Sequence, residues 1–261
     1  MANSLLSIKN LTISLKGDSL NKAIVKDVSL EIFPGSIVAL VGGSGSGKTT
    51  TGLSIMRLLS PALQITEGEI FFDQRNLLNY TDDQMRIMRG KEIGMVFQEP
   101  LNAFNPVFTI GYQIEEVLRF HTNLTRLERA QKVLDLLDTV GISEPQRVSK
   151  NYPHQLSGGM RQRAMIAQAI AADPKLIIAD EPTSNLDVTL QAKIMDLFRK
   201  LKEQFGLSIL LITHDLGMVG HLSDQIYVMT DGTIVEQGTT ETIFNRPVHE
   251  YTCQLLETLK L

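Results

Sequence analysis

Short runs of apolar and β-branched residues recur along the chain, and each has about the length of a buried strand. They are residues 36–41, 93–97, 176–179 and 208–213. A continuous apolar run, in place of strict alternation, is typical of a strand that helices cover on both faces. Residues 49–59 and 160–172 are instead rich in good helix formers. Because the two kinds of segment alternate, the sequence predicts an α/β fold with a mainly parallel sheet.

The middle of the chain has a different pattern. Residues 110–120 and 125–140 both read as amphipathic helices. In the second of them, helical spacing connects Leu127, Ala130, Val133, Leu134 and Leu137. Such a stripe ordinarily packs on neighbouring helices, so we expect a functional surface in the groove beside it.

A glycine-rich loop follows the first apolar run and fits the pattern G-x-x-x-x-G-K-[ST] at every fixed position. Its residues are Gly42, Gly43, Ser44, Gly45, Ser46, Gly47, Lys48 and Thr49. In such a loop, backbone N–H groups surround a phosphate, the lysine bridges the β- and γ-phosphates, and the last hydroxyl ligates Mg²⁺. The strand before it and the helix after it are the context that this chemistry needs. The sequence therefore predicts binding of ATP with Mg²⁺.

Two acidic residues end the apolar run 176–179. Asp180 and Glu181 then lie at the carboxyl edge of the predicted sheet, where ligands bind in open α/β folds. We expect Asp180 to hold Mg²⁺ and Glu181 to polarise the attacking water. The ordinary alternative, a solvated acidic turn after a buried strand, is less favoured beside the glycine-rich loop.

A second candidate anion site lies more than a hundred residues after the first. Ser157 offers a hydroxyl, and Gly158 and Gly159 allow bare N–H groups to approach an anion. The helix-forming run after them places the turn at a helix N-terminus, where the helix dipole favours a phosphate.

Together these motifs resemble the ATP-binding-cassette (ABC) ATPases, whose signature begins LSGG, as Leu156-Ser157-Gly158-Gly159 does. In that family this turn covers the γ-phosphate of ATP bound by a partner subunit. The resemblance therefore implies a dimer that closes on ATP.

The resemblance also implies roles for three single residues. Gln98 matches the Q-loop, which contacts Mg²⁺ or water and links to the membrane partner. Asp187, in Ser184-Asn185-Leu186-Asp187, matches the D-loop of the dimer interface. His214 matches the switch histidine at the γ-phosphate. The implied catalytic residues are thus Glu181, His214 and Gln98, and Thr49, Gln98 and Asp180 are the implied Mg²⁺ ligands.

In this family one domain is expected over residues 1–261. Its core would comprise residues 1–98 and 173–240, with an antiparallel N-terminal part. Residues 99–172 would form the helical insert that contacts a membrane subunit, and residues 241–261 a short tail.

One expected feature is missing. The family usually stacks adenine on an aromatic residue near the N-terminus, but no aromatic residue precedes Phe33. Leu15 takes the position that aligns with it. We expect adenine to rest on an apolar surface with Ile24 or Val25, without the roughly 0.5–1.5 kcal/mol that aromatic pairing adds.

Composition narrows the class further. A net charge of −4 argues against a nucleic-acid partner. The single cysteine, Cys253, allows no internal disulfide and fits a cytosolic setting. No signal peptide is expected, and no apolar run approaches the ~20 residues of a membrane helix. We therefore expect a peripheral protein on the cytoplasmic face of the inner membrane, attached through a partner.

Short sequence motifs narrow the resemblance to the peptide- and nickel-importer ATPases within this family. Residues 97–106 resemble its FQ(D/E)P…NP segment, and residues 180–189 and Met160 fit the same group. Peptide-importer subunits usually read G-E-S-G-S-G-K and carry a longer tail with cysteines. The Gly42-Gly43 opening and the short tail are more similar to nickel-import subunits.

The expected function is therefore ATP hydrolysis in a nickel importer. Its alternatives are a dipeptide or oligopeptide importer and, less favoured, a soluble ABC ATPase that does not transport. Expected partners are a second, related ATPase subunit, two membrane permeases and, through them, an extracytoplasmic binding protein. His249 and Cys253 lie four residues apart, but two ligands make a poor nickel site, so we expect the terminal helix only to pack.

Overall fold

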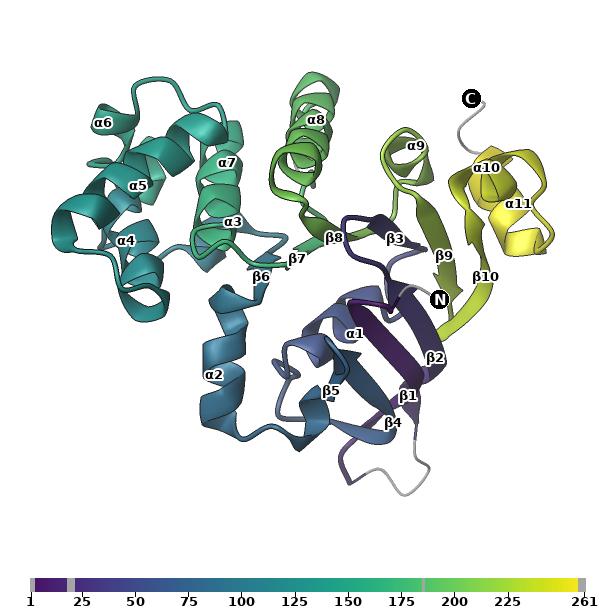
Figure 1. Ribbon diagram of the computed structural model, residues 1–261. Helices are drawn as coiled ribbons and strands as arrows, with labels where there is room; N and C mark the ends of the chain where they lie inside the picture. The colour runs from purple at the N-terminus through teal and green to yellow at the C-terminus, as the bar shows by residue number, and fades with distance from the viewer. Residues whose placement is uncertain (1–2, 18–21, 185, 258–261) are drawn as a thin grey trace. The chain divides into compact units, whose positions relative to one another are not determined.

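The computed structural model describes residues 3–17, 22–184 and 186–257. The chain forms two compact units (Figure 1). The first contains residues up to Met85 together with those from Leu201 onward, and the second contains Arg86–Lys200. Two helices carry the chain between the units, α2 (Asp82–Lys91) and α8 (Val188–Phe205). Asn185, part of the D-loop segment, lies outside the described residues.

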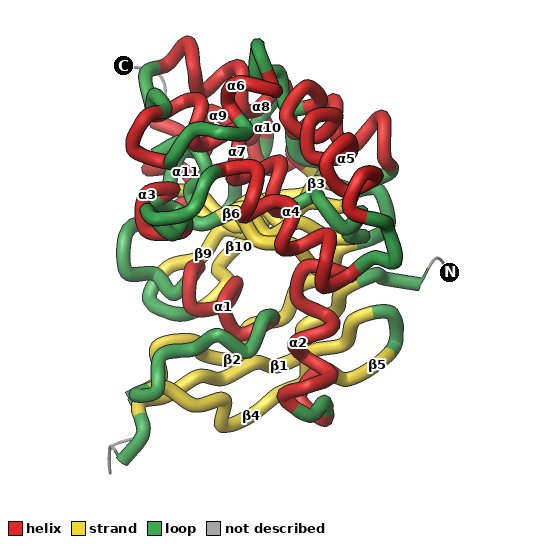
Figure 2. The backbone as a smooth tube through the Cα atoms, turned by 90° about the vertical axis from the view of Figure 1, so that its left-hand side faces the viewer, coloured by secondary structure: helices red, strands yellow, loops and turns green. Residues whose placement is uncertain are grey.

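An antiparallel sheet occupies the N-terminal part of the first unit (Figure 2). Its strand order is β2 (Ala23–Ile32), β1 (Leu6–Leu15), β4 (Leu63–Phe72) and β5 (Arg75–Asn76). Leu6 of the central strand pairs with Ile32 on one side and with Phe72 on the other, and all three side chains are buried. A short 3₁₀ turn, η1 (Leu77–Asn79), follows this sheet.

Parallel strands form the other layer of the first unit. Strand β3 (Ile37–Val41) pairs in parallel with β8 (Ser208–Thr213) and with β9 (Gln225–Thr230). Strand β10 (Thr233–Thr239) closes this edge antiparallel to β9. Every residue of β3 and β8 is buried, which explains their largely apolar sequences.

Helix α1 (Lys48–Ile55) follows β3 and ends before Leu59, the predicted end. Arg57 adopts a left-handed backbone, with φ of +50°, and this terminates the helix. The remaining helices of the first unit are α9 (Leu216–Val219), α10 (Thr240–Asn245) and α11 (Glu250–Glu257).

In the second unit, β6 (Ile93–Val96) pairs in parallel with β7 (Leu176–Asp180). Its helical part comprises α3 (Pro100–Ala103), α4 (Ile110–His121), α5 (Arg126–Thr139), α6 (Pro145–Val148), η2 (Pro153–Gln155) and α7 (Gly158–Ala169). Helices α4 and α5 lie where the sequence predicts amphipathic helices. Thr109 caps α4, and Thr125 forms a capping box with Glu128 at α5. The α/β prediction, with its antiparallel N-terminal part, is confirmed.

Candidate functional site

The predicted site residues fall into two groups, one in each unit. The first group begins at the glycine-rich loop between β3 and α1. An added Cβ on Gly42 would lie 2.0 Å from the carbonyl oxygen of Met229, so β9 leaves room only for glycine there. Gly47 has φ of +103° and caps α1 without any side-chain hydrogen bond. The residue at the N-cap of α1 therefore brings no side chain of its own to the N–H groups of the first turn.

Lys48 lies inside the curve of this loop. Its side chain is buried, and Nζ donates hydrogen bonds of 2.8 Å to the carbonyl oxygens of both Gly42 and Gly43. Space outside the loop is open, since nothing lies within 4 Å of a Cβ added at Gly45. A buried ammonium, a helix N-terminus that begins at glycine and a glycine-rich turn together fit a polyphosphate.

His214 lies at the same sheet edge as this loop. Val41 of β3 is in register with Thr213 of β8, so Gly42 and His214 follow directly from paired positions. His214 is exposed. Asp215 then caps α9 through hydrogen bonds from the N–H groups of Gly217 and Met218.

The predicted adenine surface lies partly beside the loop. A Cβ added at Gly47 would meet the carbonyl oxygen of Ile24 at 3.1 Å and Cγ2 of Val25 at 3.3 Å. These two residues of β2 therefore lie against the loop, with Ile24 half-buried and Val25 fully buried. Leu15 ends β1, where it pairs with Leu63.

In the second unit, Glu181 and Gln98 are brought together at the ends of the paired strands β7 and β6. The amide Nε2 of Gln98 donates a 3.0 Å hydrogen bond to Oε2 of Glu181. The Ser184 hydroxyl contacts the carbonyl oxygens of Glu181, at 3.0 Å, and of Gln98, at 3.3 Å. Asp180, the residue before Glu181, is buried. Sequence reasoning missed Ser184, although it follows the acidic pair by only three positions.

Glu181 has a left-handed backbone, with φ of +43°. Residues other than glycine, asparagine and aspartate rarely adopt this conformation, and where they do the residue often belongs to a functional site.

The turn Ser157–Gly159 opens α7, as predicted. Ser157 is the N-cap, and its Oγ accepts a 3.3 Å hydrogen bond from the N–H of Met160. Ser157 and Gly158 are exposed, whereas Gly159 is buried against Leu190. Asp187 is also exposed, and its Oδ1 accepts a 3.0 Å hydrogen bond from the N–H of Leu190.

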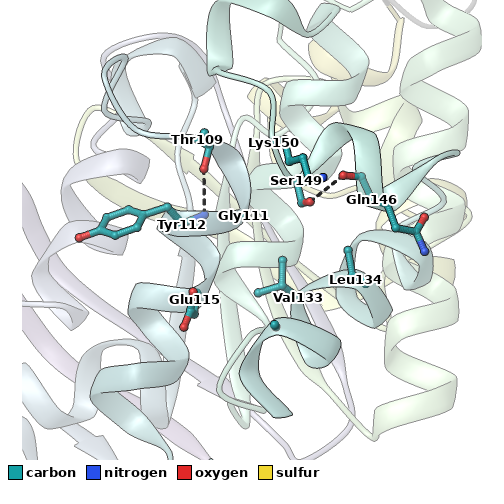
Figure 3. A pocket seen from close by; sticks show the side chains of 10 residues that line it. Thr109, Gly111, Tyr112, Glu115, Val133, Leu134, Gln146, Ser149 and Lys150 are labelled. Atoms are coloured by element: carbon teal, nitrogen blue, oxygen red, sulfur yellow. Dashed lines mark hydrogen bonds between the residues drawn. The ribbon is translucent and has the colours of Figure 1, made fainter. Parts of the chain in front are cut away.

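A cavity of about 400 Å³ lies among α4, α5 and α6 of the second unit (Figure 3). Val133 and Leu134 of the predicted apolar stripe line it, together with polar groups from Glu115, Gln146 and Lys150. Tyr112 lies at this cavity and stacks on Phe108, with ring centroids 4.8 Å apart. The groove expected beside the stripe is therefore present.

Two features are absent from the part of the chain that the structure describes. Helices within 3–17, 22–184 and 186–257 include none long and apolar enough to cross a membrane. Over the same ranges, no group of three or more His, Cys, Asp or Glu side chains is placed to hold a metal ion.

Comparison with known proteins decides the family. The profile described as "ABC transporter" matches residues 25–184. The chain belongs to the ABC transporter family. This ABC ATPase is 48% identical over 236 residues to the oligopeptide transport ATP-binding protein AppD of Bacillus subtilis, covering 90% of this chain and 72% of AppD. ATPases of this family bind ATP, normally with Mg²⁺.

A second relative is the peptidoglycan transport ATP-binding protein YejF of Agrobacterium fabrum, 49% identical over 253 residues. That match covers 97% of this ABC ATPase but only 46% of YejF, so the chain spans about half the length of that relative. Among solved structures, the ATP-binding cassette MJ0796, described as a dimer in a post-hydrolysis state bound to ADP and Pi, is 32% identical with a TM-score of 0.80. The match covers 90% of this chain and 98% of MJ0796.

Proposed function

We propose that this ABC ATPase hydrolyses ATP to drive a binding-protein-dependent importer of dipeptides or oligopeptides. The observation that carries the enzymatic part is the phosphate cradle around the buried Lys48, which supports binding of a nucleoside triphosphate. The importer part is supported by relatives such as AppD and the dipeptide transport protein DppD of Bacillus subtilis, 43% identical over 252 residues.

This proposal changes the order of the expected cargoes. The Gly42-Gly43 opening, the short tail and the single cysteine favour nickel on sequence grounds, but the named relatives above transport peptides or peptidoglycan. They support the peptide alternative better than nickel. Residues of the phosphate loop do not touch cargo, so their variation is weak evidence for what is transported.

The chemistry follows from the two groups of residues. Lys48 and the N–H groups of Gly42–Thr49 bind and orient the phosphates, and His214 faces the γ-phosphate. When bound, Mg²⁺ neutralises charge on the phosphates, and Thr49, Gln98 and Asp180 would hold it. Glu181 accepts a hydrogen bond from the attacking water and aligns it for in-line attack. Gln98 orients the Glu181 carboxylate through the 3.0 Å hydrogen bond.

We also propose that two such subunits complete each other's sites. The exposed turn Ser157–Gly159 would cover the γ-phosphate held by a related, non-identical subunit, and Asp187 would lie at the dimer interface. Within each subunit, the core would comprise residues 1–98 and 173–240, the helical insert residues 99–172 and the tail residues 241–261.

Coupling to transport would run through the second unit. Gln98 begins the segment that leads to the cavity among α4, α5 and α6. Exposed Phe108 and Tyr112 stack beside this cavity and offer apolar surface. A permease segment would dock there and hold the ATPase at the cytoplasmic face of the inner membrane. Two permeases and an extracytoplasmic binding protein would complete the importer.

The test is substrate uptake in a strain that lacks the gene and carries a plasmid copy. Lys48→Ala removes the phosphate contact and is expected to abolish accumulation of labelled dipeptide or oligopeptide, while Ni²⁺ accumulation stays normal. Lys16→Ala, at an exposed position outside the loop, is the matched control and should restore uptake.

Loss of Ni²⁺ accumulation with intact peptide uptake would establish the nickel alternative instead. Normal uptake of both would point to an ABC ATPase that does not transport.

A further inference from the structure

The C-terminal helix α11 contacts the phosphate loop through a single side chain. The hydroxyl oxygen of Tyr251 accepts a 2.7 Å hydrogen bond from the N–H of Gly43, which lies 208 positions earlier in the chain. A Cβ added at Gly43 would lie 3.1 Å from the same oxygen. A side chain at position 43 would therefore crowd the Tyr251 hydroxyl, and glycine leaves room for it.

Several contacts fix Tyr251 in this position. The Glu236 carboxylate of β10 accepts hydrogen bonds from the N–H groups of Val248, at 2.8 Å, and His249, at 3.0 Å. Nδ1 of His249 in turn accepts a 3.1 Å hydrogen bond from the N–H of Tyr251. The start of α11 is thus tied to the sheet that carries the loop.

The charge of Glu236 supports this anchor. Burial favours the neutral carboxyl, but the hydrogen bonds from the N–H groups of Val248 and His249 and the nearby His249 ring favour the carboxylate more, so the pKa of Glu236 lies below its usual range. The anchor is therefore charged at neutral pH.

Gly43 connects Tyr251 to the lysine of the loop. The carbonyl oxygen of Gly43 accepts the 2.8 Å hydrogen bond from Nζ of Lys48 and a 3.3 Å hydrogen bond from the N–H of Ser46. The Gly43 N–H shares a rigid peptide plane with the Gly42 carbonyl, which accepts the other 2.8 Å hydrogen bond from Nζ of Lys48. The hydrogen bond to Tyr251 therefore sets where the Gly42 carbonyl points. Helix α11 also packs on α9, the helix that follows His214. One tail helix thus contacts both the phosphate loop and the helix that follows His214.

We propose that Tyr251 is a positioning residue for ATP, which holds Gly43 and through it Lys48 in the geometry that receives the phosphates. This inference rests on the proposed role of the loop in ATP binding. Gly42 is fixed by the backbone of β9 on one side, and Gly43 is fixed by Tyr251 on the other, so the entrance of the loop is held from both directions. By linkage, bound nucleotide also stabilises the docked position of α11.

Tyr251→Phe tests the role, because it removes the hydroxyl and keeps the ring. We expect affinity for a fluorescent ATP analogue to fall about 3- to 10-fold, the usual effect of losing one neutral hydrogen bond. In the assembled transporter the KM for ATP should rise by a similar factor, while kcat stays within about twofold.

Tyr227→Phe is the matched control. The Tyr227 hydroxyl also accepts a hydrogen bond from a backbone N–H, that of Glu31 at 3.1 Å, but does not contact the loop. This variant should lower the melting temperature without changing ATP affinity.

Hydrogen exchange gives a second readout. Addition of ADP with Mg²⁺ should slow amide exchange in residues 250–257 of the wild type, and less so in Tyr251→Phe.

Unchanged ATP affinity in Tyr251→Phe, with wild-type binding intact, would overturn the inference about Tyr251 alone. Absence of ATP binding by the wild type would instead overturn the proposed function. Lys48→Ala supplies the signal expected of a protein that does not bind ATP.

Discussion

At the scale of single residues, Glu181 combines an unusual backbone with a constrained side chain. Its φ of +43° is unfavourable for a residue with a Cβ, by about 1–3 kcal/mol. Two neighbours hold it there: Gln98 donates to its carboxylate, and Ser184 donates to its carbonyl oxygen. The strain is thus offset by contacts that also aim the carboxylate.

Glu181→Gln keeps the shape of this side chain and removes its negative charge. Because the carboxylate aligns water and does not hold the nucleotide, ATP turnover should fall by at least about 10²-fold while ATP affinity stays nearly unchanged. Phosphate release and binding of a fluorescent ATP analogue measure the two effects. Glu203→Gln, at an exposed position, is the control. Wild-type turnover in Glu181→Gln would remove Glu181 from this role.

At the scale of elements, α2 and α4 meet in the second unit through His121. The ring fills the space beside Gly90, whose absent Cβ would lie 2.8 Å from Nε2 of His121, and Gly90 has φ of +88°. Burial, and then the charge of Lys91, lower the pKa of His121. The folded unit therefore favours the neutral ring.

This contact predicts a pH dependence of stability. Since the pKa of His121 is lower in the folded state, its contribution is fully present above the unfolded value of about 6.5 and is lost as the pH falls through the folded pKa. The wild type should therefore lose more stability between about pH 7.5 and about pH 5 than His121→Gln does. Urea unfolding at both values measures this, with His154→Gln, at an exposed position, as the control. Equal losses in wild type and His121→Gln would contradict it.

The sequence predicts elements better than it predicts contacts between them. Strands β3, β6, β7 and β8 are largely apolar because both of their faces are buried, and such a pattern can be recognised from neighbouring residues alone. The phosphate loop can likewise be recognised from eight consecutive residues, Gly42–Thr49. The Tyr251–Gly43 hydrogen bond joins positions 208 apart, and no local pattern encodes it. The carboxylate of Glu181 depends in the same way on Gln98, which lies in the loop after β6, 83 positions earlier in the chain.

At the scale of the whole molecule, the proposed reaction needs a second subunit. The turn Ser157–Gly159 opens α7 with exposed groups, and Ser157 already serves as the N-cap of that helix. A variant must therefore keep the cap if it is to test contact with a phosphate held elsewhere.

Ser157→Asp meets this condition, because aspartate caps helices as well as serine does while its charge repels a phosphate. In a dimer with a related ATPase subunit, we expect a photoreactive ATP analogue to label this chain normally and the partner weakly. Ser157→Thr keeps both the cap and the neutral hydroxyl and should leave both subunits labelled. Weak labelling of this chain alone would mean that the turn serves its own loop.

The carbonyl contacts of Lys48 determine what the loop can discriminate. Its ammonium is buried and already shares hydrogen bonds with Gly42 and Gly43, so an arriving ligand must draw it away from two backbone dipoles. A full negative charge attracts an ammonium far more strongly than a carbonyl dipole does, whereas a neutral sugar or base offers it nothing better. The loop therefore selects ligands by their negative charge and does not distinguish one nucleotide base from another. With no aromatic residue before Phe33 to stack on adenine, GTP and CTP are expected to enter beside ATP.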